Sequence, residues 1–168
     1  MKNIVLIGMP GCGKSTFGAA LAEALGRSFV DADEYLEKRE GRTIRSFFEE
    51  GEDSFRDAEE RTIRELSDKE GLVIATGGGV VKREINITRL RRRGYVIFLD
   101  RPAENILSDV EAETRPLLDE GKEKIFALYK ERILLYRKAA HRIVDNRGEK
   151  EEVLRRLLEL TKEEIPKE

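Results

Sequence analysis

The sequence predicts an α/β fold of three layers, in which helices cover both faces of a five-stranded parallel sheet. Five short apolar runs alternate with longer charged segments whose apolar residues recur at helical spacing. That alternation is typical of βαβ units, which build parallel sheets. The length of 168 residues suits one domain, so 1–168 is interpreted as a single domain.

The predicted elements follow one another along the whole chain. The strands are expected at 4–7, 28–31, 72–76, 96–100 and 142–145, because these runs are apolar and short. The helices are expected at 15–25, 33–40, 54–68, 84–92, 103–110, 122–137 and 149–161. Gly26 follows the first helix, where glycine is a common stop signal. Residues 162–168 are expected to fray.

Two segments are interpreted as insertions into this repeating pattern. Residues 41–56 carry Phe47 and Phe48 and then an acidic loop at 49–53. Residues 111–121 have turn-forming residues at both ends of a small apolar patch. Polar segments with glycine at one end are candidate lids over a site.

The most informative motif lies at 8–16 and reads Gly-Met-Pro-Gly-Cys-Gly-Lys-Ser-Thr, which fits the phosphate-binding P-loop. A predicted strand precedes it and a predicted helix follows it. Its glycines let several backbone N–H groups converge on one phosphate, and the helix N-terminus adds a positive dipole end. Lys14 can reach the β- and γ-phosphates, and the Ser15 hydroxyl can ligate Mg²⁺. The predicted nucleotide-binding residues here are Gly11, Cys12, Gly13, Lys14, Ser15 and Thr16.

Composition excludes several classes of protein. Lys and Arg number 32 against 34 Asp and Glu, so the net charge of −2 argues against general affinity for nucleic acid. No run approaches the roughly 20 apolar residues of a membrane span. Cys12 is the only cysteine, which excludes an internal disulfide and favours a reducing compartment. We therefore expect a cytoplasmic protein, with Cys12 as a small tolerated residue rather than a redox-sensitive thiol.

Further polar motifs end the second and third predicted strands. Asp31 and Asp33 could hold the Mg²⁺ hydration shell and accept a proton from an attacking hydroxyl. Alternatively, Asp33 caps a helix that begins at Glu34, and Asp31 is a solvated strand end. The glycines at 77–79 could bring a ligand against bare backbone, or form a flexible turn.

Two later polar residues carry other interpretations. Asp100 ends the fourth strand and reads either as a magnesium partner or as a helix cap ahead of Pro102; the sequence leaves both open. His141 is interpreted as structural, because no obvious partner accompanies it.

Four arginines stand beside aromatic or turn-forming residues rather than on an ordinary charged helix face. They are Arg56, Arg115, Arg132 and Arg147. The planar guanidinium suits carboxylates and phosphates. For any one of them taken alone, a solvated surface position is the commoner outcome.

Together these motifs resemble the bacterial-type shikimate kinase family over essentially the whole chain. The matching stretches are the P-loop at 8–16, Phe-x-Asp-x-Asp at 29–33, Gly-Glu-x-x-Phe-Arg at 51–56, Thr-Gly-Gly-Gly at 76–79, Thr-Arg-Pro-Leu-Leu at 114–118 and Arg-x-x-x-Tyr at 132–136. The resemblance implies a P-loop NTPase fold of the nucleoside monophosphate kinase type, with a substrate-binding insertion at about 33–60 and a lid at about 111–121. It also implies transfer of a phosphoryl group from MgATP to the 3-hydroxyl of shikimate, giving shikimate 3-phosphate and ADP, a step of chorismate and aromatic amino-acid biosynthesis.

The resemblance further assigns roles to individual residues. It implies that the substrate is bound by Asp33, Arg56, Gly77, Gly78, Gly79 and Arg132, with Glu59 orienting Arg56 and with Phe48 and Phe55 walling the site. Lys14, Asp33 and Arg115 would be catalytic, with Arg115 also contacting ATP. Ser15 would ligate Mg²⁺, and Asp31 would hold it through water. Arg147 is a candidate for contacting adenine, since it lies in the loop after the last strand.

Two other functions compete with this interpretation. A gluconate kinase-like enzyme would share the P-loop and the lid arginine, but would not need two arginines aimed at a carboxylate. A nucleotide-binding switch would have no use for so many strand-end motifs. The expected partners are ATP and shikimate only, without nucleic acid or membrane. The absence of a conspicuous apolar stripe favours a monomer.

Overall fold

Five parallel strands form one central sheet in the order β2-β3-β1-β4-β5. The structure, a computed structural model, describes residues 1–113 and 119–165. The strands are β1 (Asn3–Ile7), β2 (Ser28–Asp31), β3 (Leu72–Ala75), β4 (Gly94–Asp100) and β5 (Arg142–Asp145). All five predicted strands are confirmed, with small differences at their ends.

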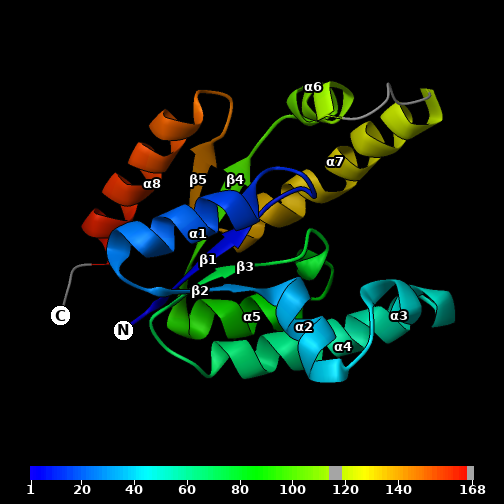
Figure 1. Ribbon diagram of the computed structural model, residues 1–168, viewed down its shortest axis with the longest axis horizontal. Helices are drawn as coiled ribbons and strands as arrows, with labels where there is room; N and C mark the ends of the chain where they lie inside the picture. Colours follow the sequence, from blue (N-terminus) through cyan, green and yellow to red (C-terminus); the bar gives the residue numbers. More distant parts are fainter. Residues whose placement is uncertain (114–118, 166–168) are drawn as a thin grey trace.

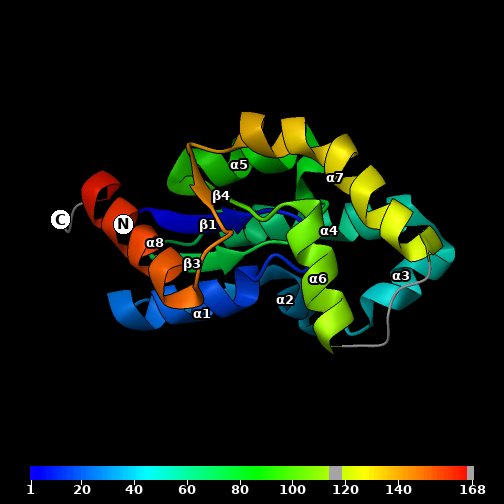
Figure 2. The same cartoon turned by 90° about the horizontal axis from the view of Figure 1, so that it is seen from above.

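Helices cover both faces of the sheet, as predicted (Figures 1 and 2). One face is covered by α1 (Lys14–Leu25) and α8 (Lys150–Glu164). The other face carries α5 (Glu84–Arg93) and α7 (Asp119–Ala139), with α4 (Glu52–Ser67) packed beside α5. The remaining helical segments are α2 (Ala32–Glu40), α3 (Ile44–Glu50), the short 3₁₀ helix η1 (Val80–Lys82) and α6 (Ala103–Glu113).

Strand β1 lies at the centre of the core. Its four apolar residues, 4–7, have no exposed surface, and it pairs with β3 on one side and β4 on the other. The backbone N–H and side-chain hydroxyl of Thr76 both donate to the Leu6 carbonyl, at 3.2 and 2.8 Å. The loops that follow β1 and β3 therefore leave the sheet side by side, at the edge where parallel sheets place their ligands.

The segment 41–56 is more regular than predicted. It contains α3 and the first turn of α4, and Thr43 caps α3 by accepting a hydrogen bond from the Ser46 backbone N–H. Phe47 is buried in a small second core with Leu36, Phe55 and Ala58. A helix of seven residues between Gly41 and Gly51 is too short to show a clear helical period in the sequence.

The predicted lid at 111–121 is described only at its ends. Residues 111–113 end α6, and 119–121 begin α7. The intervening residues 114–118, including Arg115, lie outside the described residues. In the described part of the chain, no helix is both long enough and apolar enough to cross a bilayer.

His141 is structural, as predicted. Its Nδ1 accepts a hydrogen bond from the Val96 N–H at 2.9 Å, and its own backbone N–H donates to the Val96 carbonyl at 2.8 Å. Its ring stacks on Tyr95, with centroids 4.9 Å apart. These contacts attach the start of β5 to β4.

The junction between α5 and β4 generates a stability prediction. A Cβ on Gly94 would lie 2.5 Å from the backbone oxygen of Leu90 and 3.1 Å from Val5 Cγ2, so Gly94→Ala requires the backbone to move. We expect a loss of about 1–3 kcal/mol in the free energy of unfolding, measured by urea denaturation. Gly148→Ala is the control: its nearest atom is the end of the Glu152 side chain, at 3.2 Å, and its effect should stay within about 0.5 kcal/mol. Equal losses for the two variants would contradict this account.

Candidate active site

The P-loop connects β1 to α1 and uses glycine where the backbone demands it. Gly11 and Gly13 adopt φ values of 80° and 93°, a region that side chains rarely enter. Gly13 is also the N-cap of α1, so the free N–H groups of the first turn face the loop. Ser15 and Thr16 lie exposed in that turn. The arrangement is the anion-binding geometry that the motif predicts.

Lys14 is buried against the loop that precedes it. Its Nζ donates to the backbone carbonyls of Gly8 at 2.8 Å and Met9 at 2.9 Å. The buried Cys12 thiol lies 3.7 Å from the same Nζ. A buried thiol packed inside the loop fits a small structural residue, because reactive cysteines are partly exposed.

Asn146, which the sequence analysis did not single out, anchors the P-loop to the end of β5. Its Nδ2 donates to the Cys12 carbonyl at 2.7 Å, and its backbone N–H donates to the Asp100 carbonyl at 3.0 Å. Its own carbonyl accepts from Arg101 Nη1 at 2.6 Å. The one available signal was its position directly after a predicted strand. The next residue, Arg147, is mostly exposed, and its Nε lies 3.6 Å from Asp145 Oδ1.

Asp31 joins the first turn of α1 to the start of α2. One carboxylate oxygen accepts from Ser15 Oγ, and the other accepts from the backbone N–H groups of Asp33 and Glu34, at 3.0 and 3.1 Å. Asp31, not Asp33, is therefore the helix cap, and α2 begins at Ala32 rather than at Glu34. The alternative that made Asp33 the cap is wrong, and the Asp33 side chain is left for another role.

The Asp33 carboxyl lies against the glycines that follow β3. A Cβ on Gly77 would be 2.8 Å from Asp33 Oδ1. Burial and the nearby Asp31 raise the pKa of Asp33, while Lys14 and Arg56 oppose that rise. A carboxyl whose pKa is raised toward neutrality is suited to accept a proton.

The three glycines are required by space rather than by an unusual backbone angle, because none of them has a positive φ. A Cβ on Gly78 would lie 2.6 Å from Cδ of Pro10 in the P-loop, and one on Gly79 would lie 2.6 Å from Cζ of Arg56. The space that a side chain at these positions would need is therefore filled by Pro10 and Arg56 of the protein itself. The segment 77–79 is the meeting point of the P-loop, Asp33 and Arg56.

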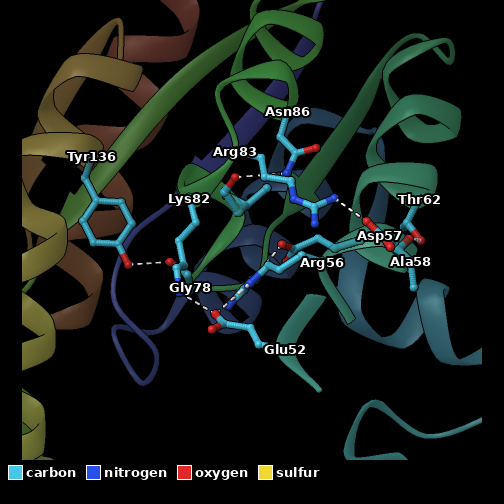
Figure 3. A network of polar contacts seen from close by, with 12 residues as sticks. Glu52, Arg56, Asp57, Ala58, Thr62, Gly78, Lys82, Arg83, Asn86 and Tyr136 are labelled. Carbon is cyan, nitrogen blue, oxygen red and sulfur yellow. Dashed lines mark hydrogen bonds and ion pairs between the residues drawn. The ribbon is translucent and has the colours of Figure 1, made fainter. Parts of the chain in front are cut away.

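Arg56 of α4 lies between the carboxylates of Glu52 and Glu59, and Figure 3 shows its contact with Glu52. It is 7% exposed; its Nη1 donates to Glu59 at 2.7 Å and its Nε to Glu52 at 3.3 Å. Burial raises the pKa of Glu59, and the neighbouring Arg56 opposes that rise. Glu59 is 3% exposed, and its second oxygen, Oε2, has no hydrogen-bond partner among the described residues.

Arg132 and Tyr136 reach the same place from α7. Arg132 is 7% exposed, and its Nε has no hydrogen-bond partner in the part of the chain that the structure describes. Tyr136 is fully buried and donates to the Gly78 carbonyl at 2.6 Å (Figure 3). Burial raises the pKa of Tyr136 to about 12, and the charges of Arg132 and Arg56 oppose this. The Arg132 guanidinium is thus close enough to Tyr136 and Glu59 to affect their pKa values, and Arg56 lies against Gly79.

Three other predicted positions complete the description. Phe48 and Phe55 stack with centroids 4.7 Å apart, Phe48 exposed and Phe55 buried. Asp100 accepts a hydrogen bond from Tyr129 of α7 at 3.0 Å. No group of three or more His, Cys, Asp or Glu side chains that could hold a metal ion occurs within the described ranges.

The geometry combines a phosphate cradle, a carboxyl with a raised pKa and two buried arginines at one edge of the sheet. Phosphoryl transfer needs these parts: a held phosphate, a positioned hydroxyl and a proton acceptor. The two arginines add a preference for an acceptor that carries an anionic group. The site can therefore transfer a phosphoryl group from a nucleotide to a small hydroxylated acid.

Comparisons with known proteins agree with this chemistry. A family model described as shikimate kinase matches residues 10–162. A shikimate kinase of Clostridium botulinum (strain Eklund 17B / Type B) is 53% identical over 155 residues, 92% of this chain and 94% of that protein. A structure of shikimate kinase from Acinetobacter baumannii in complex with shikimate matches with a TM-score of 0.88 and 38% identity, over 99% of this chain and 96% of that chain. A gluconokinase from Sinorhizobium meliloti matches with a TM-score of 0.63 and 21% identity, over 94% of this chain and 90% of that chain, which shows the fold alone.

The buried pair of Arg56 and Glu59 generates a pH-dependent prediction. Arg56→Met removes the cation nearest to a buried carboxylate, so we expect a loss of about 3–5 kcal/mol in the free energy of unfolding at pH 7.5. The folded-state pKa of Glu59 is already raised and rises further without Arg56, so the folded variant gains a proton as the pH falls. The loss should therefore be smaller at pH 5, as measured by urea denaturation at both values.

A matched control separates this effect from the loss of any ion pair. Arg61→Met, on the same helix, breaks a partly exposed pair with Glu40 at 3.0 Å and should cost about 0–1 kcal/mol at either pH. If Arg56→Met lost the same free energy at pH 5 and pH 7.5, an unpaired Glu59 charge would not be the cause.

Proposed function

The chain belongs to the shikimate kinase family, and from that membership we propose which of its residues bind each substrate and transfer the phosphoryl group. As an enzyme of this family it uses ATP to phosphorylate shikimate at the 3-hydroxyl, giving shikimate 3-phosphate and ADP. The observation that carries the residue assignment is the convergence of Arg56, Arg132 and Asp33 on the glycine segment beside the P-loop.

The donor half of the site consists of the P-loop and the first turn of α1. The backbone N–H groups from Gly11 to Thr16 would cradle the ATP phosphates, and Lys14 would neutralise charge on the β- and γ-phosphates. Arg147, exposed in the loop after β5, is the candidate for contacting adenine. Asn146 would hold the P-loop next to that loop through its hydrogen bond to the Cys12 carbonyl.

Ser15 and Asp31 would hold Mg²⁺ together with the ATP phosphates. Their oxygens are already in contact, and hydroxyl and carboxylate oxygens are the ligands that Mg²⁺ prefers. Bound Mg²⁺ supplies positive charge that offsets the charge of the transferring phosphoryl group. With Ser15 as a direct ligand and Asp31 acting through water, the remaining positions fall to phosphates and water, which is usual for this ion.

The acceptor half is formed by α2, α4, α7 and the glycine segment. Arg56 and Arg132 would bind the shikimate carboxylate through charge-assisted hydrogen bonds, and Gly78 would contribute its backbone N–H beside Gly77 and Gly79. Asp33 would hold the 3-hydroxyl and accept its proton as the oxygen attacks the γ-phosphate. Arg115, which lies outside the described residues, would contact ATP and stabilise the transferring group when the segment closes and excludes water.

A gluconate kinase-like activity is the main competitor, because such enzymes share this fold. Gluconate is also a carboxylate, so two buried arginines do not by themselves distinguish it from shikimate. The preference for shikimate rests on the family model and on the 53% identity to a shikimate kinase. We also propose that the enzyme acts as a cytoplasmic monomer, and light scattering of the purified protein tests the oligomeric state.

The direct test is a coupled assay of ADP release from MgATP. We expect ADP release with shikimate, and none above background with gluconate or without an acceptor. If the protein bound ATP but released no ADP in response to shikimate, the acceptor assignment would be refuted and the assignment of the ATP-binding residues would stand.

Asp33→Asn tests the proton acceptor. We expect kcat to fall by about 10²–10⁴-fold, while the dissociation constant of ATP, measured by calorimetry, stays close to wild type. Glu34→Gln, at the exposed neighbouring position, should leave kcat unchanged. Because the pKa of Asp33 is raised, the acid limb of the wild-type kcat/KM profile should lie closer to neutrality than that of an ordinary aspartate. If Asp33→Asn kept most of the wild-type activity, Asp33 would not be the proton acceptor.

Arg132→Ala tests the binding of the carboxylate. Losing a charge-assisted contact should raise the KM for shikimate by about 10–100-fold, and the KM for ATP should change far less. Arg137→Ala, on the exposed face of the same helix, is the control and should change neither constant. A comparable rise in both KM values would show that Arg132 does not act on the acceptor.

A further inference from the structure

We propose that Lys82 is a positioning residue for the acceptor: by neutralising Glu52, it leaves the Arg56 guanidinium available for the carboxylate of shikimate. Lys82 does not itself contact the substrate in this proposal, and it acts through Glu52 and Arg56. The inference rests on the proposed role of Arg56 as a ligand of that carboxylate.

The geometry is a short chain of charges that leads from η1 to Arg56. Lys82 is the last residue of η1, three positions after Gly79, and Glu52 is the first residue of α4. Lys82 Nζ donates to Glu52 Oε1, and the same oxygen accepts from Arg56 Nε at 3.3 Å. Figure 3 shows Lys82 and Arg56 on the Glu52 carboxylate. One oxygen therefore bridges the two cations.

The balance of charge explains why Arg56 needs this help. Arg56 contacts two carboxylates, Glu52 and Glu59, and the Asp33 carboxyl lies close enough to raise the pKa of Glu59. A bound substrate carboxylate adds another negative charge to the same guanidinium. If Arg56 alone had to balance Glu52, Glu59 and the substrate, the attraction available to the substrate would fall.

Lys82 is the stronger of the two partners of Glu52. The contact from Lys82 is closer than the 3.3 Å contact from Arg56, and the hydrogen bond from Lys82 is the main reason that the pKa of Glu52 is lowered. Lys82 therefore balances most of the Glu52 charge, and Arg56 keeps its own charge for Glu59 and the acceptor. Because Glu52 and Lys82 are partly exposed, solvent screens the effect and its size is modest.

The neighbouring residue provides a matched comparison. Arg83 Nη1 donates to Asp57 at 2.7 Å, which is another ion pair between the η1–α5 region and α4 (Figure 3). Among the described residues, no hydrogen bond or ion pair links this pair to Arg56 or Glu52, so it joins the same elements without touching Arg56. A purely structural role for such pairs would make Lys82 and Arg83 equivalent.

Steady-state kinetics at low ionic strength separate these roles. Lys82→Met should raise the KM for shikimate about two- to fivefold, with kcat and the KM for ATP unchanged. Lys82→Arg, which keeps the cation, should restore the KM to near wild type. Arg83→Met should leave all three constants unchanged. An unchanged KM in Lys82→Met, or an equal rise in Arg83→Met, would overturn the proposal.

A double-mutant cycle tests whether Lys82 acts through Glu52. In a Glu52→Gln background there is no carboxylate charge to neutralise, so adding Lys82→Met should not raise the KM for shikimate further. A rise of the same size in both backgrounds would mean that Lys82 acts on the acceptor directly, which would overturn the proposal. Failure of the underlying function is distinguishable, because the wild-type enzyme would then show no shikimate-dependent ADP release and no KM for shikimate could be measured.

Discussion

The close approach of charged side chains to the backbone at 77–79 is the constraint on which the rest of the site depends. Asp33, Arg56 and the P-loop proline Pro10 each occupy space that a side chain on one of these glycines would need. Because the glycines follow β3, and β3 pairs with β1, this crowded point is fixed next to the P-loop by the sheet itself. Donor and acceptor groups are therefore held together by backbone packing.

The helices outside the sheet serve this arrangement from two sides. Helix α4 brings Arg56 and Glu59, and α7 brings Arg132 and Tyr136. Tyr136 attaches α7, which also carries Arg132, to the glycine segment through the Gly78 carbonyl. Each guanidinium is buried. A buried charge needs nearby groups that offset its loss of hydration, and those groups also fix its orientation.

Local patterns in the sequence predicted the sheet, the P-loop and most helices, because hydrophobic period and glycine spacing are written within short stretches. They did not predict which oxygen of Asp31 caps α2, that Asn146 holds Cys12, or that Lys82 meets Glu52. The last two contacts join residues far apart in the chain, and a single polar residue carries no sign of such a partner. Asp31 and Asp33 are near neighbours, and the sequence alone does not say which of them caps the helix. The glycines at 77–79 were recognised, but their main reason, room for the protein's own side chains, is visible only in three dimensions. The roles of Arg115 and the segment around it stay predictions.

The small second core around Phe47 has a consequence for how the two halves of the site respond to disturbance. Leu36, Phe47, Phe55 and Ala58 pack together apart from the main core, while Ile63 and Leu66, farther along α4, belong to the main core. The C-terminal part of α4 thus packs in the main core, and its N-terminal part packs in the small second core. Local opening of that cluster would loosen the acceptor half while the nucleotide half stayed folded. Tolerance to substitution should accordingly be uneven: changes in the satellite cluster should disturb the acceptor half more than the scaffold that holds the phosphates.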